Sequence, residues 1–427
     1  MPNGIDHALR RDAIDELHAR PFPVVTAPAR AAFFAFTPPE GPQSRDAAAE
    51  WAHLLKLLDY FGLAHPTPGA SHFSEKSGGV WLSWESHSEF TTYTAILDDL
   101  GKSPFDGSEF EVFPTDWMSK IPGVKLSSCA IRIEECTDTK AIQLSLKSWF
   151  EPESLSVSRV LDDAAVIAGD YRTDASGNLR FALFADPSTG PRRIGRIIQR
   201  LNEIEIYKSM SMLGLFEARK LSQDLSRVDS QLADLVADLR KEDVSAEKNL
   251  HDLLGISANL EGLSARVNYR FSASKAYAAI VNQRIEVLRE RQFEGLQSFR
   301  EFMMRRFDPS MRTVQAMDGR LQDLIARAIR TGNLLRTRVD VERQSESQEL
   351  LESMNKRADL QLKLQKTVEG LSVVAISYYA TALMVYVFLP VADIFNIPKS
   401  IVAASIVPFV IFGVVFALRR IRRRLPS

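Results

Sequence analysis

Two uncharged stretches near the C-terminus decide the fold: LSVVAISYYATALMVYVFLPVA at 371–392 and SIVAASIVPFVIFGVVFAL at 400–418. A helix rises about 1.5 Å per residue, so each stretch is long enough to cross a hydrocarbon core of about 30 Å. The segment 393–399 between them is short enough for a tight turn. We therefore predict a two-helix transmembrane hairpin with a basic tail at 370–427. A pair of buried core helices is the alternative, but neither centre carries a charge.

The arginines that follow the second stretch indicate its orientation. They are Arg419, Arg420, Arg422, Arg423 and Arg424. Short Arg-rich flanks stay on the cytoplasmic side of a membrane, and a hairpin places both of its ends on one side. We therefore expect cytoplasmic N- and C-termini and an outward-facing turn. The first residues, MPNGIDHALRRDAIDE, lack the apolar stretch of a signal peptide.

The composition of the whole chain hides a strong asymmetry. The chain has 53 basic and 54 acidic side chains and a mean hydropathy of −0.11, as in a soluble protein. The last 57 residues, however, contain six basic residues and one acidic residue. Two cysteines exclude a disulfide scaffold, and the near-zero net charge argues against a nucleic-acid partner. The expected partner is the lipid bilayer.

The first part of the chain, 1–190, is predicted to be a mixed α/β cytoplasmic domain of the α+β class. Its short β-branched or aromatic segments indicate strands. The segment 47–61 has apolar residues at helical spacing and ends at Gly62, which suits a helix C-terminus. The predicted strands are 79–84, 89–96, 130–134 and 179–184.

The second part, 191–369, is predicted to be a bundle or stalk of long helices, with breaks near Gly214, Gly255 and Gly262. Apolar residues recur every seven residues from Val314 to Leu335, which is typical of a coiled coil, and the pattern resumes at Leu351. Two interpretations stay open: packing within the chain, or packing against copies of the chain around an axis. The seam comprises Val314, Met317, Leu321, Leu324, Ala328 and Leu335, then Leu351, Met354, Ala358 and Leu362.

The motifs that usually mark enzymes are missing. The sequence has no phosphate-binding glycine loop, no G-x-S-x-G, no H-E-x-x-H and no paired C-x-x-C. We therefore expect no enzyme and no certain cofactor. On a strand, Glu85, His87 and Glu89 would share one face and could hold a divalent cation. The alternative for these three residues is a solvated strand face.

The first apolar stretch carries a stripe of small, hydroxyl and larger side chains on one helical face. This stripe either lines a water-filled path or packs against another membrane helix. In the turn, Asp393 and Asn396 would attract cations if several copies formed a ring. The candidate pore-lining residues are Gly370, Ser377, Thr381, Met384 and Phe388.

Five stretches together resemble a bacterial family described only as predicted membrane-anchored proteins, with a domain of unknown function. The resemblance covers nearly the whole chain and implies a bacterial inner (plasma) membrane. It implies no chemistry. The stretches are 16–23, 84–94, 195–207, 334–340 and 364–379.

The architecture also resembles the CorA-type divalent-cation channels, which are pentamers whose first span lines the pore and ends in Gly-Met-Asn. This chain has YVFLPVAD at 386–393 instead, without that motif. The resemblance implies an oligomeric inner-membrane protein that acts as a cation channel or transporter. The alternative is a membrane-anchored cytoplasmic scaffold or sensor without transport, because no charged group lies inside either span.

Overall fold

The computed structural model describes residues 7, 9–11, 14, 21–239, 245–394 and 398–422. The chain forms two compact units. The first comprises Met1–Arg240 and His251–Thr331, and the second comprises Lys241–Leu250 and Gly332–Ser427. The domain boundaries expected from the sequence, at residues 190 and 369, stay a prediction.

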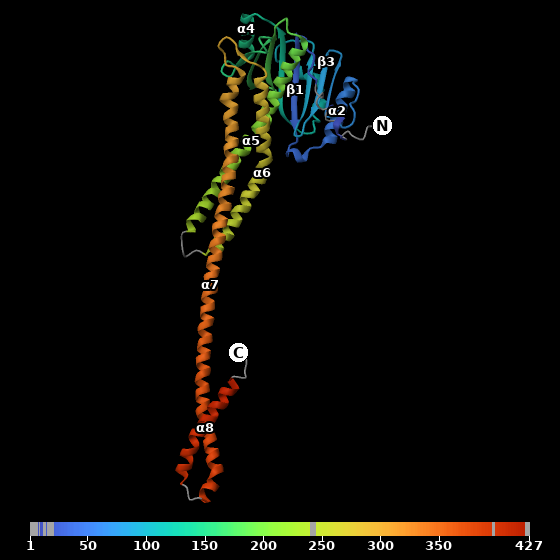
Figure 1. Cartoon of the computed structure of the whole chain (residues 1–427). Coiled ribbons are helices and arrows are strands. Elements are labelled where there is room, and N and C mark those ends of the chain that lie inside the picture. Colours follow the sequence, from blue (N-terminus) through green and yellow to red (C-terminus); the bar gives the residue numbers. More distant parts are fainter. Residues whose placement is uncertain are drawn as a thin grey trace. The chain divides into compact units, whose positions relative to one another are not determined.

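Among the described residues, nine strands of the first unit form one mixed sheet in the order β2-β3-β4-β1-β5-β8-β7-β6-β9 (Figure 1). The strand pairs are antiparallel except β5 and β8, which run parallel. The strands are β1 (Ala29–Thr37), β2 (His72–Ser77), β3 (Val80–Ser86), β4 (Thr91–Leu97), β5 (Val124–Glu135), β6 (Ser156–Val160), β7 (Ala165–Thr173), β8 (Leu179–Ala185) and β9 (Arg291–Gln292).

The predicted α+β class is confirmed, and the four predicted strands correspond to β3, β4, β5 and β8. The predicted helix is α2 (Ala47–Phe61), which ends at Gly62 in the left-handed conformation, with φ 63°. The central strand β1 was not predicted. Its sequence, ARAAFFAFT, is apolar on both faces because both faces are covered, so it lacks the alternation that marks a half-exposed strand.

Different helices cover the two faces of the sheet. Phe34 and Phe36 of β1 pack with α2 in one aromatic core, together with the short helix α3 (Thr115–Met118). A second core on the sheet contains α4 (Thr139–Trp149). Phe33 points to the opposite face, because successive strand side chains alternate. There α5 (Pro191–Asp238) lies against β5, and Ser127 Oγ donates to Glu205 Oε1 at 3.0 Å.

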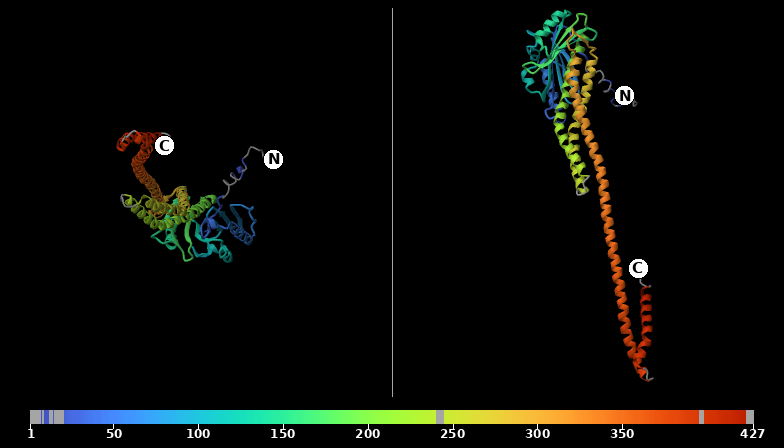
Figure 2. Two further views of the ribbon diagram at one scale, coloured as in Figure 1. Left: turned by 90° about the horizontal axis from the view of Figure 1, so that it is seen from below. Right: turned by 90° about the vertical axis from the view of Figure 1, so that its left-hand side faces the viewer.

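In the first unit, α5 packs beside α6 (Ala246–Glu286) and the beginning of α7 (Phe299–Ile394), as Figures 1 and 2 show. The prediction of long helices is confirmed, but the predicted breaks at glycines are wrong. Helix α5 continues through Gly214 because the glycine lets α6 approach: a Cβ there would lie 2.3 Å from Ser274 Oγ. Gly255 and Gly262 likewise lie inside α6, since a helix tolerates one glycine at a cost of about 1 kcal/mol.

The heptad seam on α7 divides into two parts with different surroundings. Val314, Leu321 and Ala328 are buried by the chain's own helices, which supports packing within the chain for that part. In contrast, Leu351 and Leu362 are 61% and 56% exposed. For the second part, packing against copies of the chain stays open.

The second unit ends in two apolar helices, the last turns of α7 and α8 (Lys399–Arg422). Both are long and apolar enough to cross a membrane by length and composition, and only 6% of each apolar window is buried. A proline at 408 lies inside α8. The final apolar helix pair predicted from the sequence is therefore present.

Candidate functional site

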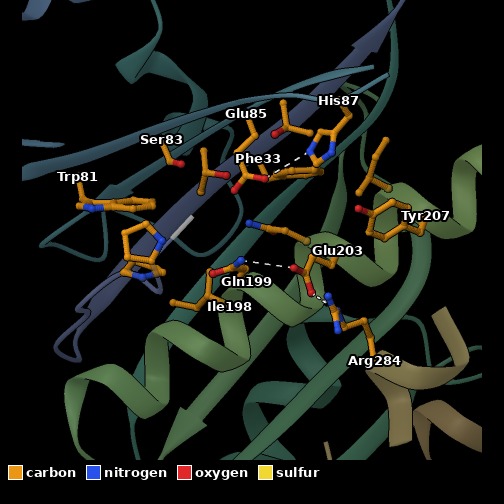
Figure 3. A pocket seen from close by; sticks show the side chains of 16 residues that line it. Phe33, Trp81, Ser83, Glu85, His87, Ile198, Gln199, Glu203, Tyr207 and Arg284 are labelled. Atoms are coloured by element: carbon orange, nitrogen blue, oxygen red, sulfur yellow. Dashed lines mark hydrogen bonds and ion pairs between the residues drawn. The ribbon is translucent and has the colours of Figure 1, made fainter. Parts of the chain in front are cut away.

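A cavity of about 220 Å³ lies in the first unit, between the sheet and α5 (Figure 3). Strands β1, β3 and β4 form one side of it, and α5 forms the other. Two prolines before β1, Pro21 and Pro23, and Arg284 of α6 complete the lining. The full lining is Pro21, Pro23, Phe33, Trp81, Ser83, Glu85, His87, Thr92, Thr94, Ile198, Gln199, Asn202, Glu203, Ile206, Tyr207 and Arg284.

The sheet side of the cavity carries an acid and an imidazole. Glu85 Oε2 lies 3.3 Å from His87 Nε2, so the two residues form a pair at the end of β3. The His87 ring stacks on Phe90, with ring centroids 4.3 Å apart, and the backbone N–H of His87 donates to the Phe90 carbonyl at 2.9 Å. The turn after β3 therefore holds the imidazole in place.

The helix side carries a second charged pair. Glu203 of α5 forms an ion pair with Arg284 of α6, and Gln199 Nε2 donates to Glu203 Oε1 at 3.3 Å. Burial raises the pKa of the Glu203 carboxyl, and the positive charge of Arg284 partly offsets that rise. Glu85 raises it further, so the two acidic groups influence one another across the cavity (Figure 3).

The three residues predicted as metal ligands are only partly brought together. Strand β3 ends at Ser86, so the alternation that would align Glu89 with Glu85 and His87 stops there. Glu89 is 2% exposed and forms an ion pair with Arg270. It also accepts from the Tyr277 hydroxyl at 2.8 Å. No group of three His, Cys, Asp or Glu residues suited to a metal ion occurs in the described part of the chain.

Sequence reasoning missed the helix side of the cavity. Gln199, Glu203 and Arg284 belong to no standard motif, and only their position on helices packed against the sheet joins them to Glu85. A signal was nevertheless present. Three of the five stretches that carry the family resemblance, 16–23, 84–94 and 195–207, contribute residues to this one cavity.

The candidate pore-lining residues of α7 have mixed surroundings. Ser377 is 7% exposed and lines an apolar cavity of about 290 Å³ with Thr381 and residues of α8. Ser377 Oγ has no hydrogen-bond partner among the described residues. Met384 and Phe388 are 44% and 45% exposed, and Gly370 is also exposed.

The structure does not describe the side chains of the two residues that we expected to attract cations, Asp393 and Asn396. Asp393 lies in the last turn of α7, and its side chain lies outside the described residues. Asn396 lies outside the described residues altogether.

Comparison with known proteins gives one match. Neither the comparison with curated proteins nor that with solved structures found a similar protein. One family model matches residues 5–425, nearly the whole chain, and its description is "Protein of unknown function (DUF3422)". The match agrees with the resemblance to a family of unknown function seen in the sequence. The chain therefore belongs to the DUF3422 family.

Proposed function

We propose that this protein is a membrane-anchored sensor that binds a small polar molecule in the cavity between the sheet and α5. The two C-terminal helices hold it in the bacterial inner membrane, with both termini on the cytoplasmic side. The protein catalyses no reaction. The observation that carries the proposal is the cavity itself, which three family stretches line together.

The lining favours a ligand that carries hydrogen-bond donors. Two carboxylates, Glu85 and Glu203, and the amides of Gln199 and Asn202 converge on a volume of about 220 Å³. Trp81 and Phe33 add apolar surface beside them. A few placed polar groups in a partly apolar cavity are typical of small-molecule sites, and the volume favours a ligand of modest size.

The surroundings of α7 favour anchoring over conduction. Ser377 and Thr381, the hydroxyl residues of the predicted pore stripe, lie in the cavity that α7 shares with α8. Small and hydroxyl residues commonly occupy such contacts between membrane helices. No acidic or basic residue lies in 371–392 or 400–418 to mark an ion path.

An oligomeric CorA-like cation channel is the second candidate. One observation favours it: the apolar side chains of α7 before the first span are exposed, among them Leu351, Met354 and Leu362. Copies of the chain would cover them, as five would in a CorA-like pentamer. In that assembly Asp393 and Asn396 would form rings, which is a known selectivity device.

A pocket-filling variant tests the sensor proposal. Ser83 lines the cavity, and its cross-strand partner Ser74 on β2 does not. Purified full-length wild type, Ser83→Leu and Ser74→Leu are screened for thermal stabilisation against one library of polar metabolites. We expect compounds that stabilise wild type and Ser74→Leu but not Ser83→Leu. If every stabilising compound acts equally on all three proteins, the cavity is not the binding site.

Reconstitution separates the two candidates. Full-length protein in liposomes that contain a divalent-cation dye is expected to give no flux above empty liposomes, and the detergent-solubilised protein is not expected to form a five-fold ring. Cation flux together with a ring whose first span is innermost would replace the sensor proposal with the channel.

A further inference from the structure

A second cavity of the first unit is dominated by arginines. It measures about 580 Å³ and is lined by four guanidinium groups and one carboxylate. Three of the arginines come from the first turns of α5 at positions 193, 196 and 200, a spacing that places them along one helical face. The lining is Leu161, Arg193, Arg196, Arg200, Glu286, Val287 and Arg289.

The backbone around this cavity is held by the arginines themselves. Arg193 Nη2 donates to the Leu161 carbonyl at 2.6 Å, and Arg200 Nη1 donates to the Val287 carbonyl at 3.1 Å. Arg289 Nη2 lies 2.9 Å from the Asp162 carboxylate. These contacts use only part of the donors that four guanidinium groups provide.

Arg196 is the residue whose hydrogen-bonding capacity is least used. Its Nε atom is buried and has no hydrogen-bond partner among the described residues. A buried donor without a partner costs free energy unless a ligand or water accepts from it. Like charges are also crowded here: burial and the nearby charges of Arg196, Arg284 and Arg289 lower the pKa of Arg200, which Glu203 offsets only in part.

The chemistry of the lining selects a multiply charged anion. Guanidinium groups bind phosphate oxygens through paired hydrogen bonds. The four guanidinium groups outnumber the nearby carboxylates of Glu286, Asp162 and Glu203. The positive end of a long helix adds to the attraction, since α5 begins at Pro191. A volume of about 580 Å³ lies within the range of small-molecule sites.

We infer that Arg193, Arg196, Arg200 and Arg289 form a binding site for a small molecule that carries two or more linked phosphate groups. The site is separate from the cavity between the sheet and α5, and it does not depend on the function proposed for that cavity. A free pyrophosphate and a nucleotide share this chemistry, and the nucleotide adds a nucleoside for the remaining volume.

Calorimetric titration of the full-length protein in detergent tests the site, with pyrophosphate and ATP as probes at low ionic strength. Wild type is expected to bind pyrophosphate, and Arg196→Gln to weaken binding about tenfold or more, as expected for a charged hydrogen bond. Unlike Arg193 and Arg200, Arg196 donates to no backbone carbonyl among the described residues, so Arg196→Gln leaves those backbone contacts in place. The matched control is Arg305→Gln on α7, an exposed arginine outside the lining, which is expected to bind as wild type does.

The two probes identify the source of the phosphates. Binding of ATP about tenfold tighter than pyrophosphate supports the site and assigns it to a nucleotide, whereas equal binding supports it and assigns it to a simple polyphosphate. Absence of binding by the wild type would overturn the inference. Equal weakening by Arg196→Gln and Arg305→Gln would also overturn it, because the binding would then be general electrostatic attraction.

Discussion

Gly195 in the second turn of α5 lies directly against the segment that carries Pro23. A Cβ atom at position 195 would lie 1.8 Å from the Pro23 carbonyl oxygen and 2.8 Å from its carbon, whereas Cβ contacts under 3.0 Å essentially never occur. Replacement by alanine must therefore displace this backbone by about 1 Å or more, and overpacking of this kind typically costs about 1–3 kcal/mol. Alanine gains at most about 1 kcal/mol of helix propensity in return.

Even with the full gain in helix propensity, we expect Gly195→Ala to lower the free energy of unfolding of the sheet domain by up to about 2 kcal/mol. The matched control is Gly255→Ala in α6, where a Cβ would meet no atom within 4 Å. That variant is expected to be stabilised by up to about 1 kcal/mol.

Urea unfolding of the full chain, followed by tryptophan fluorescence, measures both effects. The five tryptophans lie between residues 51 and 149, so the signal reports on the sheet domain. Because Pro23 also lines the cavity between the sheet and α5, Gly195→Ala is expected to change that cavity as well. A Gly195→Ala protein as stable as Gly255→Ala would refute the close approach of Pro23 to α5.

Four further substitutions test three other parts of the structure. Burial lowers the pKa of His53, so the sheet domain should lose stability as the pH falls below about 6.5, by at most about 1.4 kcal/mol per pH unit. Urea midpoints at neutral and acidic pH should show a smaller loss for His53→Gln, and an equal loss would contradict this. Glu89 is buried and Arg270 is 14% exposed, so Glu89→Ala leaves a mostly buried guanidinium without its carboxylate and should cost about 3 kcal/mol in the same assay. A loss within about 0.5 kcal/mol would exclude the pair. In thermal melts followed by circular dichroism, Leu335→Ala should cost about 2–5 kcal/mol and Leu351→Ala at most about 0.5 kcal/mol, whereas equal losses would mean that copies of the chain cover Leu351.

The sequence predicted the elements with a simple periodicity and missed those that depend on contacts between distant segments. The helix 47–61 and the apolar hairpin helices have local signals, a terminal glycine and an uninterrupted apolar run. Gly214 was misread as a break because its cost is offset by the close approach of α6, which a single segment does not reveal. Gly255 was misread because one glycine costs a long helix only about 1 kcal/mol. Strand β1 was missed for a similar reason, since burial on both faces removes the alternating pattern.

In the candidate site, too, residues with a local sequence signal were predicted, and residues joined only by tertiary packing were missed. Glu85 and His87 were found because they lie two residues apart on one strand. Glu203 and Arg284 are distant from them in sequence and become neighbours only when α5 and α6 pack on the sheet. Glu89 was expected beside Glu85 and His87, but β3 ends at Ser86 and Glu89 pairs instead with Arg270 of α6. The end of a strand is difficult to place from sequence.

Membrane anchoring by the C-terminal hairpin is the central claim, and cysteine labelling in intact bacterial cells tests it most directly. The native thiols, Cys129 and Cys136, belong to β5 and the segment after it in the sheet domain. A membrane-impermeant maleimide should therefore leave wild-type protein unlabelled until the cells are lysed. An Asp393→Cys variant should be labelled in intact cells, because the proposed orientation places the segment between α7 and α8 on the outer side. Labelling of Asp393→Cys only after lysis would contradict the account.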